Sequence, residues 1–182
     1  MSQIMTSYIR TTGATAARGR DKLTFAFPPR PQAVTLYVQG VELGTSLMVN
    51  ARVLHVGADD SVAFPNLELD RVSGGYRIQF AVNAVDFRVS ALAAFPPLGT
   101  LFELRGVVGK TGIVQLHQSI VRAAETSGSA SSALPLPAAW AGQVLQINAG
   151  SNTTNGIVGI RNVHLERGVH SMEAMRRLAG TA

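Results

Sequence analysis

Hydrophobic residues alternate with polar or small residues at every second position along much of this chain. In the clearest run, Tyr76, Ile78 and Phe80 share one parity, and Arg77 and Gln79 share the other. Successive side chains of a β-strand point to opposite faces of a sheet, so this is the period of a half-buried strand. The same alternation recurs in residues 23–27, 34–38, 67–69, 102–105, 114–117 and 145–147. The pattern predicts strands almost throughout the chain.

Turn-forming sequences rich in glycine, proline and aspartate separate these runs. They are residues 28–31, 57–60, 73–75, 96–99 and 109–112. Many short strands at this spacing, with prolines at the joints, are typical of an antiparallel sandwich or barrel. Two longer segments of small and polar residues, 126–139 and 149–156, are predicted to be loops. The expected fold class is therefore all-β.

The last predicted strand contains a change of parity. Val158 and Ile160 share one parity, whereas Val163 and Leu165 share the other. An extra residue in one strand produces such a switch, so we expect a β-bulge around residues 161–162.

A short C-terminal helix is predicted from Ser171 to Leu178. Ser171 is suited to cap its first turn, where Glu173 also lies, and the arginines 176–177 fall in its last turn before Gly180. We expect residues 1–20 to form an extended N-terminal arm and residues 21–182 to form a single β-sandwich domain with one hydrophobic core.

The composition limits the classes of function. Charged residues make up 15% of the chain, against about 25% in an average soluble domain, so we expect part of the surface to be buried in a homo-oligomer. The absence of cysteine excludes disulfides and thiol chemistry. No apolar run approaches the ~20 residues of a membrane span, and no membrane partner is expected. The net charge is +5, but apart from local clusters at residues 18–22 and 176–177 the arginines are scattered singly, which argues against nucleic-acid binding.

No catalytic constellation is complete, and we predict no enzyme, no cofactor and no metal. Residues 109–111 resemble the end of a phosphate-binding loop, but Leu104 occupies the place of its first glycine, and a strand rather than a helix follows. The eleven acids are spread singly, so that Glu68 and Glu103 give no glycosidase pair from sequence. Asp59 and Asp60 lie in a predicted loop, where an Asx turn is favoured over a calcium site.

The histidines show no metal-binding pattern. None of them has an i, i+4 histidine partner on a predicted helix, and His117 and His164 are expected at solvent-facing sheet positions. The four histidines are His55, His117, His164 and His170.

Carbohydrate binding would use exposed aromatic rings and loop amides. Tyr76 shares the parity of core residues and is expected in the core. Tyr37 lies between Leu36 and Val38 and is expected on the opposite, exposed sheet surface. Trp140 follows a long loop, where an anchor for that loop is favoured over a sugar platform. The remaining candidates are Tyr8, Asn148, Asn152 and Asn155.

The first forty residues resemble the leading segment of phage structural proteins that carry a laminin-G/concanavalin-A-like jelly roll. Residues 7–9 (Ser-Tyr-Ile) and 11–12 (Thr-Thr) match, Arg10 stands where proline is commoner, and residues 20–21 (Arg-Asp) precede Leu23. The segments GGYRIQF, LFELRGVV and RNVHLERGVHSMEAMRRL are similar in kind to that group, so the resemblance extends from about residue 7 to 178.

This resemblance implies a bacteriophage virion component that is assembled in the host cytoplasm and displayed on the particle surface. The expected function is a capsid decoration or head-fibre protein, which attaches non-covalently to the major capsid protein or a tail component as a homo-oligomer, such as a trimer. The alternative is a carbohydrate-binding module of a tail or spike that recognises a host surface glycan. No ligand-binding residue is assigned from sequence.

Overall fold

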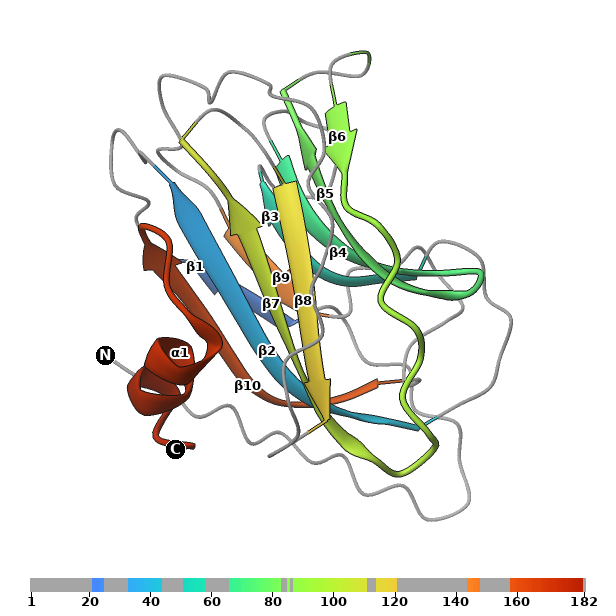
Figure 1. Cartoon of the computed structure of the whole chain (residues 1–182). Helices are drawn as coiled ribbons and strands as arrows, with labels where there is room; N and C mark the ends of the chain where they lie inside the picture. Colours follow the sequence, from blue (N-terminus) through green and yellow to red (C-terminus); the bar gives the residue numbers. More distant parts are fainter. Residues whose placement is uncertain are drawn as a thin grey trace.

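The chain folds into two antiparallel β-sheets and one short helix (Figure 1). The computed structural model describes residues 21–24, 33–43, 51–57, 66–82, 85, 87–110, 114–120, 144–147 and 158–181. Within these residues the six-stranded sheet has the order β1-β9-β3-β4-β5-β6, and the four-stranded sheet has the order β10-β2-β7-β8. The predicted all-β jelly-roll sandwich with a C-terminal helix is confirmed.

Most strands correspond to the predicted runs of alternating residues, whereas β3 and β6 were not among those runs. The six-stranded sheet contains β1 (Asp21–Thr24), β3 (Ala51–Gly57), β4 (Asn66–Val72), β5 (Gly75–Ala81), β6 (Phe87–Val89) and β9 (Val144–Ile147). The four-stranded sheet contains β2 (Val34–Glu42), β7 (Leu101–Val108), β8 (Val114–Ile120) and β10 (Val158–Arg167), and the helix α1 spans Met172–Ala179. Strands β3 to β6 form a meander of consecutive neighbours.

The hydrophobic core lies between the two sheets. Every second residue of each central strand points inward and is buried, as the alternation predicts. The four-stranded sheet contributes Leu36, Val38, Phe102, Leu104, Val114 and Leu116, and the six-stranded sheet contributes Leu54, Val56, Leu67, Leu69, Tyr76, Ile78 and Phe80. Burial of this apolar surface is the main favourable contribution to folding.

The predicted bulge and helix caps are confirmed. The register between β10 and β2 shifts between Ile160 and Asn162. The side chain of Ser171 accepts a hydrogen bond from the backbone N–H of Ala174 at 3.1 Å, and Gly180 ends the helix with a φ of +67°. This left-handed conformation is one that glycine adopts without steric cost.

The turn predictions are confirmed where the structure describes them. Turns lie at residues 73–74 and 98–99. Strands β7 and β8 pair antiparallel from Val108 opposite Val114, so a strand follows the Gly-Lys-Thr sequence, as expected. The predicted arm (1–20) and the predicted loops at 28–31, 126–139 and 149–156 lie outside the described residues.

The helix α1 covers part of the outer face of the four-stranded sheet, and this corrects the prediction for Tyr37. That side chain was expected to be exposed, but it is fully buried against Met172 and Met175 of α1. Its hydroxyl donates a hydrogen bond to Glu103 Oε1 at 2.7 Å, and Arg176 Nε donates to Glu103 Oε2 at 2.8 Å. The parity of Tyr37 was read correctly, but the face that it points to is covered by a helix from the end of the chain.

A buried polar cluster joins the two sheets at one end of the core. Glu42 points inward from β2, and its carboxylate lies 3.2 Å from Nη2 of Arg71 on β4. The hydroxyl of Tyr76 on β5 donates to the other carboxylate oxygen of Glu42 at 2.5 Å. The guanidinium of Arg71 also lies over the ring of Phe95, 4.1 Å from its centroid. These contacts compensate two charges that are removed from water.

The described part of the chain contains no helix that is long and apolar enough to cross a membrane.

Substitution of either Glu42 or Arg71 in the buried polar cluster is expected to destabilise the fold strongly. Glu42→Gln keeps the shape of the side chain but removes the charge opposite Arg71, so we expect a loss of about 3–5 kcal/mol in the free energy of unfolding. The double variant Glu42→Gln/Arg71→Met should lose less than the sum of the two single variants, because neither charge is left behind. Urea denaturation of the four proteins measures both effects.

The exposed pair Glu173 and Arg177 provides the matched control. Its side chains are 67% and 70% exposed, respectively. Removal of this pair should change the free energy of unfolding by less than about 0.5 kcal/mol. An equal effect of the buried and exposed pairs would contradict a structural role for the Glu42–Arg71 pair.

Candidate functional site

The six-stranded sheet has a polar outer face on the side away from the core. On β4, Leu67 and Leu69 point inward, so Asn66, Glu68 and Asp70 point outward. Residues paired across antiparallel strands share a face, and the register places a set of neighbours beside these three. We define the outer face by Arg52, His55, Asn66, Glu68, Asp70, Arg77, Gln79, Phe87 and Val89.

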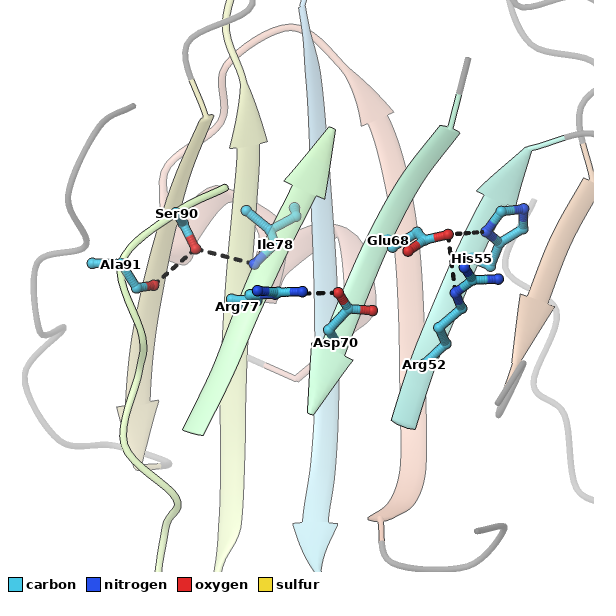
Figure 2. A network of polar contacts seen from close by, with 8 residues as sticks. All are labelled: Arg52, His55, Glu68, Asp70, Arg77, Ile78, Ser90 and Ala91. Carbon is cyan, nitrogen blue, oxygen red and sulfur yellow. Dashed lines mark hydrogen bonds and ion pairs between the residues drawn. The ribbon is translucent and has the colours of Figure 1, made fainter. Parts of the chain in front are cut away.

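Two carboxylates on this face are held by basic residues from the adjacent strands. Oε1 of Glu68 lies 2.9 Å from Nδ1 of His55 and 3.1 Å from Nε of Arg52, both on β3. Oδ2 of Asp70 accepts a hydrogen bond from Nε of Arg77 on β5 at 3.3 Å. Figure 2 shows these contacts running across β3, β4 and β5. The pairs fix the orientation of side chains that come from three strands.

The acids are buried, but the arginines remain accessible. Glu68 and Asp70 are almost entirely shielded from solvent. The side chains of Arg52 and Arg77 keep 36% and 30% of their surface exposed, respectively. Long side chains of this kind lie with their stems on the sheet while the charged head reaches water. A ligand would therefore meet guanidinium groups whose positions are set by the buried carboxylates that they contact.

The pKa of Asp70 is raised to about 6, mainly by burial and in part by the neighbouring carboxylate of Glu68. Arg77 and Arg52 act in the opposite direction, because a nearby cation favours the ionised acid. Burial is the larger effect, so Asp70 takes up a proton in a mildly acidic range.

Two buried polar atoms of the outer face make no hydrogen bond within the structure described. They are Nε2 of His55 and Oδ1 of Asn66. An unsatisfied buried polar atom costs about 1–3 kcal/mol. Such atoms are uncommon in natural proteins and often mark a functional site.

An aromatic ring lies on the same face, on the edge strand and level with Asn66, four residues along from the row of Asp70 and Arg77. Phe87 lies on β6 opposite Ala81, and 45% of its surface is exposed. The segment that follows β6 is fixed to β5, because Oγ of Ser90 accepts from the backbone N–H of Ile78 at 3.0 Å and donates to the carbonyl of Ala91 at 2.8 Å (Figure 2). The outer face therefore combines an accessible ring, two guanidinium groups and the half-buried amide of Gln79.

The structure separates the candidates that the sequence offered. Tyr76 lies in the core, as predicted. Glu68 and Glu103 belong to different sheets, and Glu103 is occupied by Tyr37 and Arg176, so they form no pair. The candidates that lie outside the described residues are Tyr8, Asp59, Asp60, Trp140, Asn148, Asn152 and Asn155.

The histidines differ in their surroundings. His117 and His164 are half-buried on the outer side of the four-stranded sheet, and burial lowers the pKa of His164. His170 is half-buried, whereas His55 is buried beside Glu68. Among the described residues, no group of three or more His, Cys, Asp or Glu side chains could hold a metal ion.

The sequence analysis missed the residues that form the outer face. The pattern Glu68-Leu69-Asp70 places two acids on one face of a strand, and this signal was available. Their partners come from β3 and β5, however, and the pairing of strands cannot be read from the sequence. Phe87 was overlooked because only tyrosine and tryptophan were considered as sugar-stacking rings.

No protein-family model matches the chain, and no curated protein is similar to it in sequence. The fold is similar to solved structures at low identity. The enzymatically active domain of bacteriophage CBA120 tailspike protein 2 has a TM-score of 0.52 and 14% identity, over 88% of this chain and 25% of the tailspike chain. The exoplasmic/lumenal domain of VIP36, solved with Ca²⁺ and Man3GlcNAc bound, has a TM-score of 0.55 and 13% identity, over 87% and 80% of the two chains.

These similarities show the jelly-roll fold and nothing finer. This chain spans about a quarter of the tailspike chain that it resembles. A point variant of HCR/D gives a TM-score of 0.58 at 9% identity, over 88% of this chain and 40% of that chain. Proteins as different as a tailspike domain and the VIP36 domain share this architecture, and function has to be argued from the outer face itself.

The raised pKa of Asp70 predicts that stability falls as the pH rises from 4 to 6. The folded state favours the protonated form of Asp70. The stabilisation that this gives to the folded state is complete below the ordinary pKa of 3.8 and is lost as the pH rises past about 6. We expect the loss to be on the order of a few kcal/mol. Asp70→Asn should remove this part of the pH profile, as measured by urea denaturation between pH 4 and 7.5. Glu173→Gln, an exposed acid, should leave the profile unchanged, and an unaltered profile for Asp70→Asn would contradict the assignment.

Proposed function

We propose that this chain is a glycan-binding jelly-roll module of a bacteriophage tail or spike, and that it recognises a host surface glycan through the outer face of its six-stranded sheet. The observation that carries the proposal is the combination on this face of an exposed aromatic ring with oriented arginines. Aromatic rings stack on the apolar faces of sugars, and polar groups beside them fix the orientation of the hydroxyls.

Each group of the outer face has a role in this binding. Phe87 supplies the stacking surface at the edge of the sheet. The guanidinium groups of Arg52 and Arg77 donate hydrogen bonds to oxygens of the ligand, and Glu68 and Asp70 hold the arginines in place. Because the side chains are ordered before the ligand arrives, less entropy is lost on binding.

The similarity of fold supports the phage context and the class of ligand. One similar structure is a domain of a phage tailspike, and another was solved with the oligosaccharide Man3GlcNAc bound. The leading segment of the chain also resembles phage structural proteins.

Substitution of the exposed groups should weaken glycan binding without affecting the fold. We expect Phe87→Ala and Arg77→Ala each to reduce affinity by about tenfold, the loss that corresponds to one stacking or charge-assisted contact. The variants would be compared on an array of bacterial surface polysaccharides, and their thermal unfolding would be followed in parallel. Val169→Ala, an exposed apolar residue between β10 and α1, is the matched control and should bind like the wild type. Wild-type binding by Phe87→Ala and Arg77→Ala would contradict the assigned face.

Capsid decoration is the second candidate function. The observation that favours it is the exposure of Val85 and Leu92, which are 82% and 51% exposed beside β6, in a chain with few charges. Apolar side chains of this kind become buried at a contact with another subunit.

Mass spectrometry of purified phage particles separates the two functions. A tail or spike module should be present at a few copies per particle, whereas a decoration protein that attaches as an oligomer should approach the copy number of the major capsid protein. Absence of the chain from particles would contradict both.

A further inference from the structure

We propose that the glycan recognised by the outer face is acidic, and that Arg52 and Arg77 together hold its carboxylate or sulfate groups. This inference rests on the proposed function, because it names the chemical class of the ligand for the same site.

The two arginines flank one position of the sheet. Arg52 on β3 and Arg77 on β5 are both paired in register with Asp70 on the strand between them. Adjacent strands lie about 4.8 Å apart, so the backbones of the two arginines are roughly 10 Å apart. This spacing allows both long side chains to reach a single anionic group above Asp70. Planar guanidinium groups match carboxylate and sulfate oxygens in geometry as well as in charge.

The accessible charge on the outer face is entirely positive among the residues described. Arg52 and Arg77 reach solvent, whereas Glu68 and Asp70 beside them are buried. The whole chain carries a formal charge of +5, which attracts a polyanion over a longer range. Uncharged amides could bind a neutral sugar equally well, so the exposed positive charge favours an acidic ligand.

The existing ion pairs leave the arginines available to a ligand. The contact from Arg77 to Asp70 is 3.3 Å long and runs through Nε (Figure 2). A strong charge-assisted hydrogen bond is about 2.7–2.9 Å long. Asp70 therefore keeps Arg77 in place through Nε only, and the planar guanidinium can pair with an anionic group of the ligand as well.

Binding of an anionic group near Asp70 is coupled to the uptake of a proton by this carboxylate. The charged and titratable groups that face Asp70 are Arg52 and His55 from β3, Glu68 from its own strand and Arg77 from β5. An anion placed above Asp70 disfavours its ionised form, so binding of an acidic glycan draws a proton onto Asp70. By linkage, lower pH then strengthens binding.

The test compares a matched pair of probes on the full chain. Polygalacturonate carries free carboxylates, and fully methyl-esterified polygalacturonate has the same backbone without charge. We expect the ester to bind at least about tenfold more weakly by biolayer interferometry at low salt. Arg77→Gln should reduce binding of the free acid and leave the ester unchanged. Arg161→Gln removes the same charge from an exposed position on β10 and should change neither by more than about twofold.

The variant Asp70→Asn should change the affinity and its pH dependence in a way that a purely structural role of Asp70 would not produce. It mimics the protonated acid, so it should bind polygalacturonate more tightly than the wild type at pH 7.5. It should also lose the increase in affinity that the wild type shows between pH 7.5 and pH 5.5.

The outcomes separate this inference from the proposed function. A panel of acidic polysaccharides (polygalacturonate, alginate, heparin) and neutral ones (dextran, galactan, mannan) is measured first. Binding to the neutral set alone, or equal binding of acid and ester, would overturn the acidic class and leave a glycan-binding module. Binding to neither set, together with no binding on the bacterial array, would overturn both.

Discussion

The buried pair of Glu42 and Arg71 fixes how the two sheets meet. Arg71 must point inward to reach Glu42, and this sets the parity of β4 for its whole length. Leu67 and Leu69 then enter the core, and the acids at positions 68 and 70 are turned to the outer face. A slip of one residue would exchange these two sets and leave both charge and apolar surface misplaced. The ion pair therefore links the stability of the core to the chemistry of the opposite surface.

Most of the fold followed from patterns within single segments. The alternation identified the strands other than β3 and β6 and placed Tyr76 in the core. The change of parity located the bulge near residue 161, and Ser171 and Gly180 marked the ends of α1. Each of these depends on residues that are close in sequence. Tyr37 was predicted wrongly because α1, which covers it, begins at residue 172. Alternation shows which face of a sheet a side chain points to, but it gives no sign of what packs on that face.

The candidate site was less predictable because its parts come from separate strands. Single acids along the chain looked isolated in the sequence, but pairing of β3, β4 and β5 brings Glu68 and Asp70 between three basic side chains. The order of charged residues in the sequence also does not show which of them are buried. In the structure the acids Glu68 and Asp70 are buried and the arginines remain accessible. The resemblance to phage proteins gave the correct class of fold. The absence of catalysis, the oligomeric state and the place in the virion remain predictions.

Hydrogen exchange of the full chain, with and without a bound polysaccharide, tests most directly whether the outer face of the six-stranded sheet is the binding surface. Binding there should slow amide exchange in peptides that cover β3 to β6, above all around Arg77 and Phe87, because a ligand on the face restricts local opening of these strands. Peptides from α1 and β10 should be unchanged. Protection confined to α1 and β10, with none in β3 to β6, would contradict the account and move the binding surface to the opposite side of the sandwich.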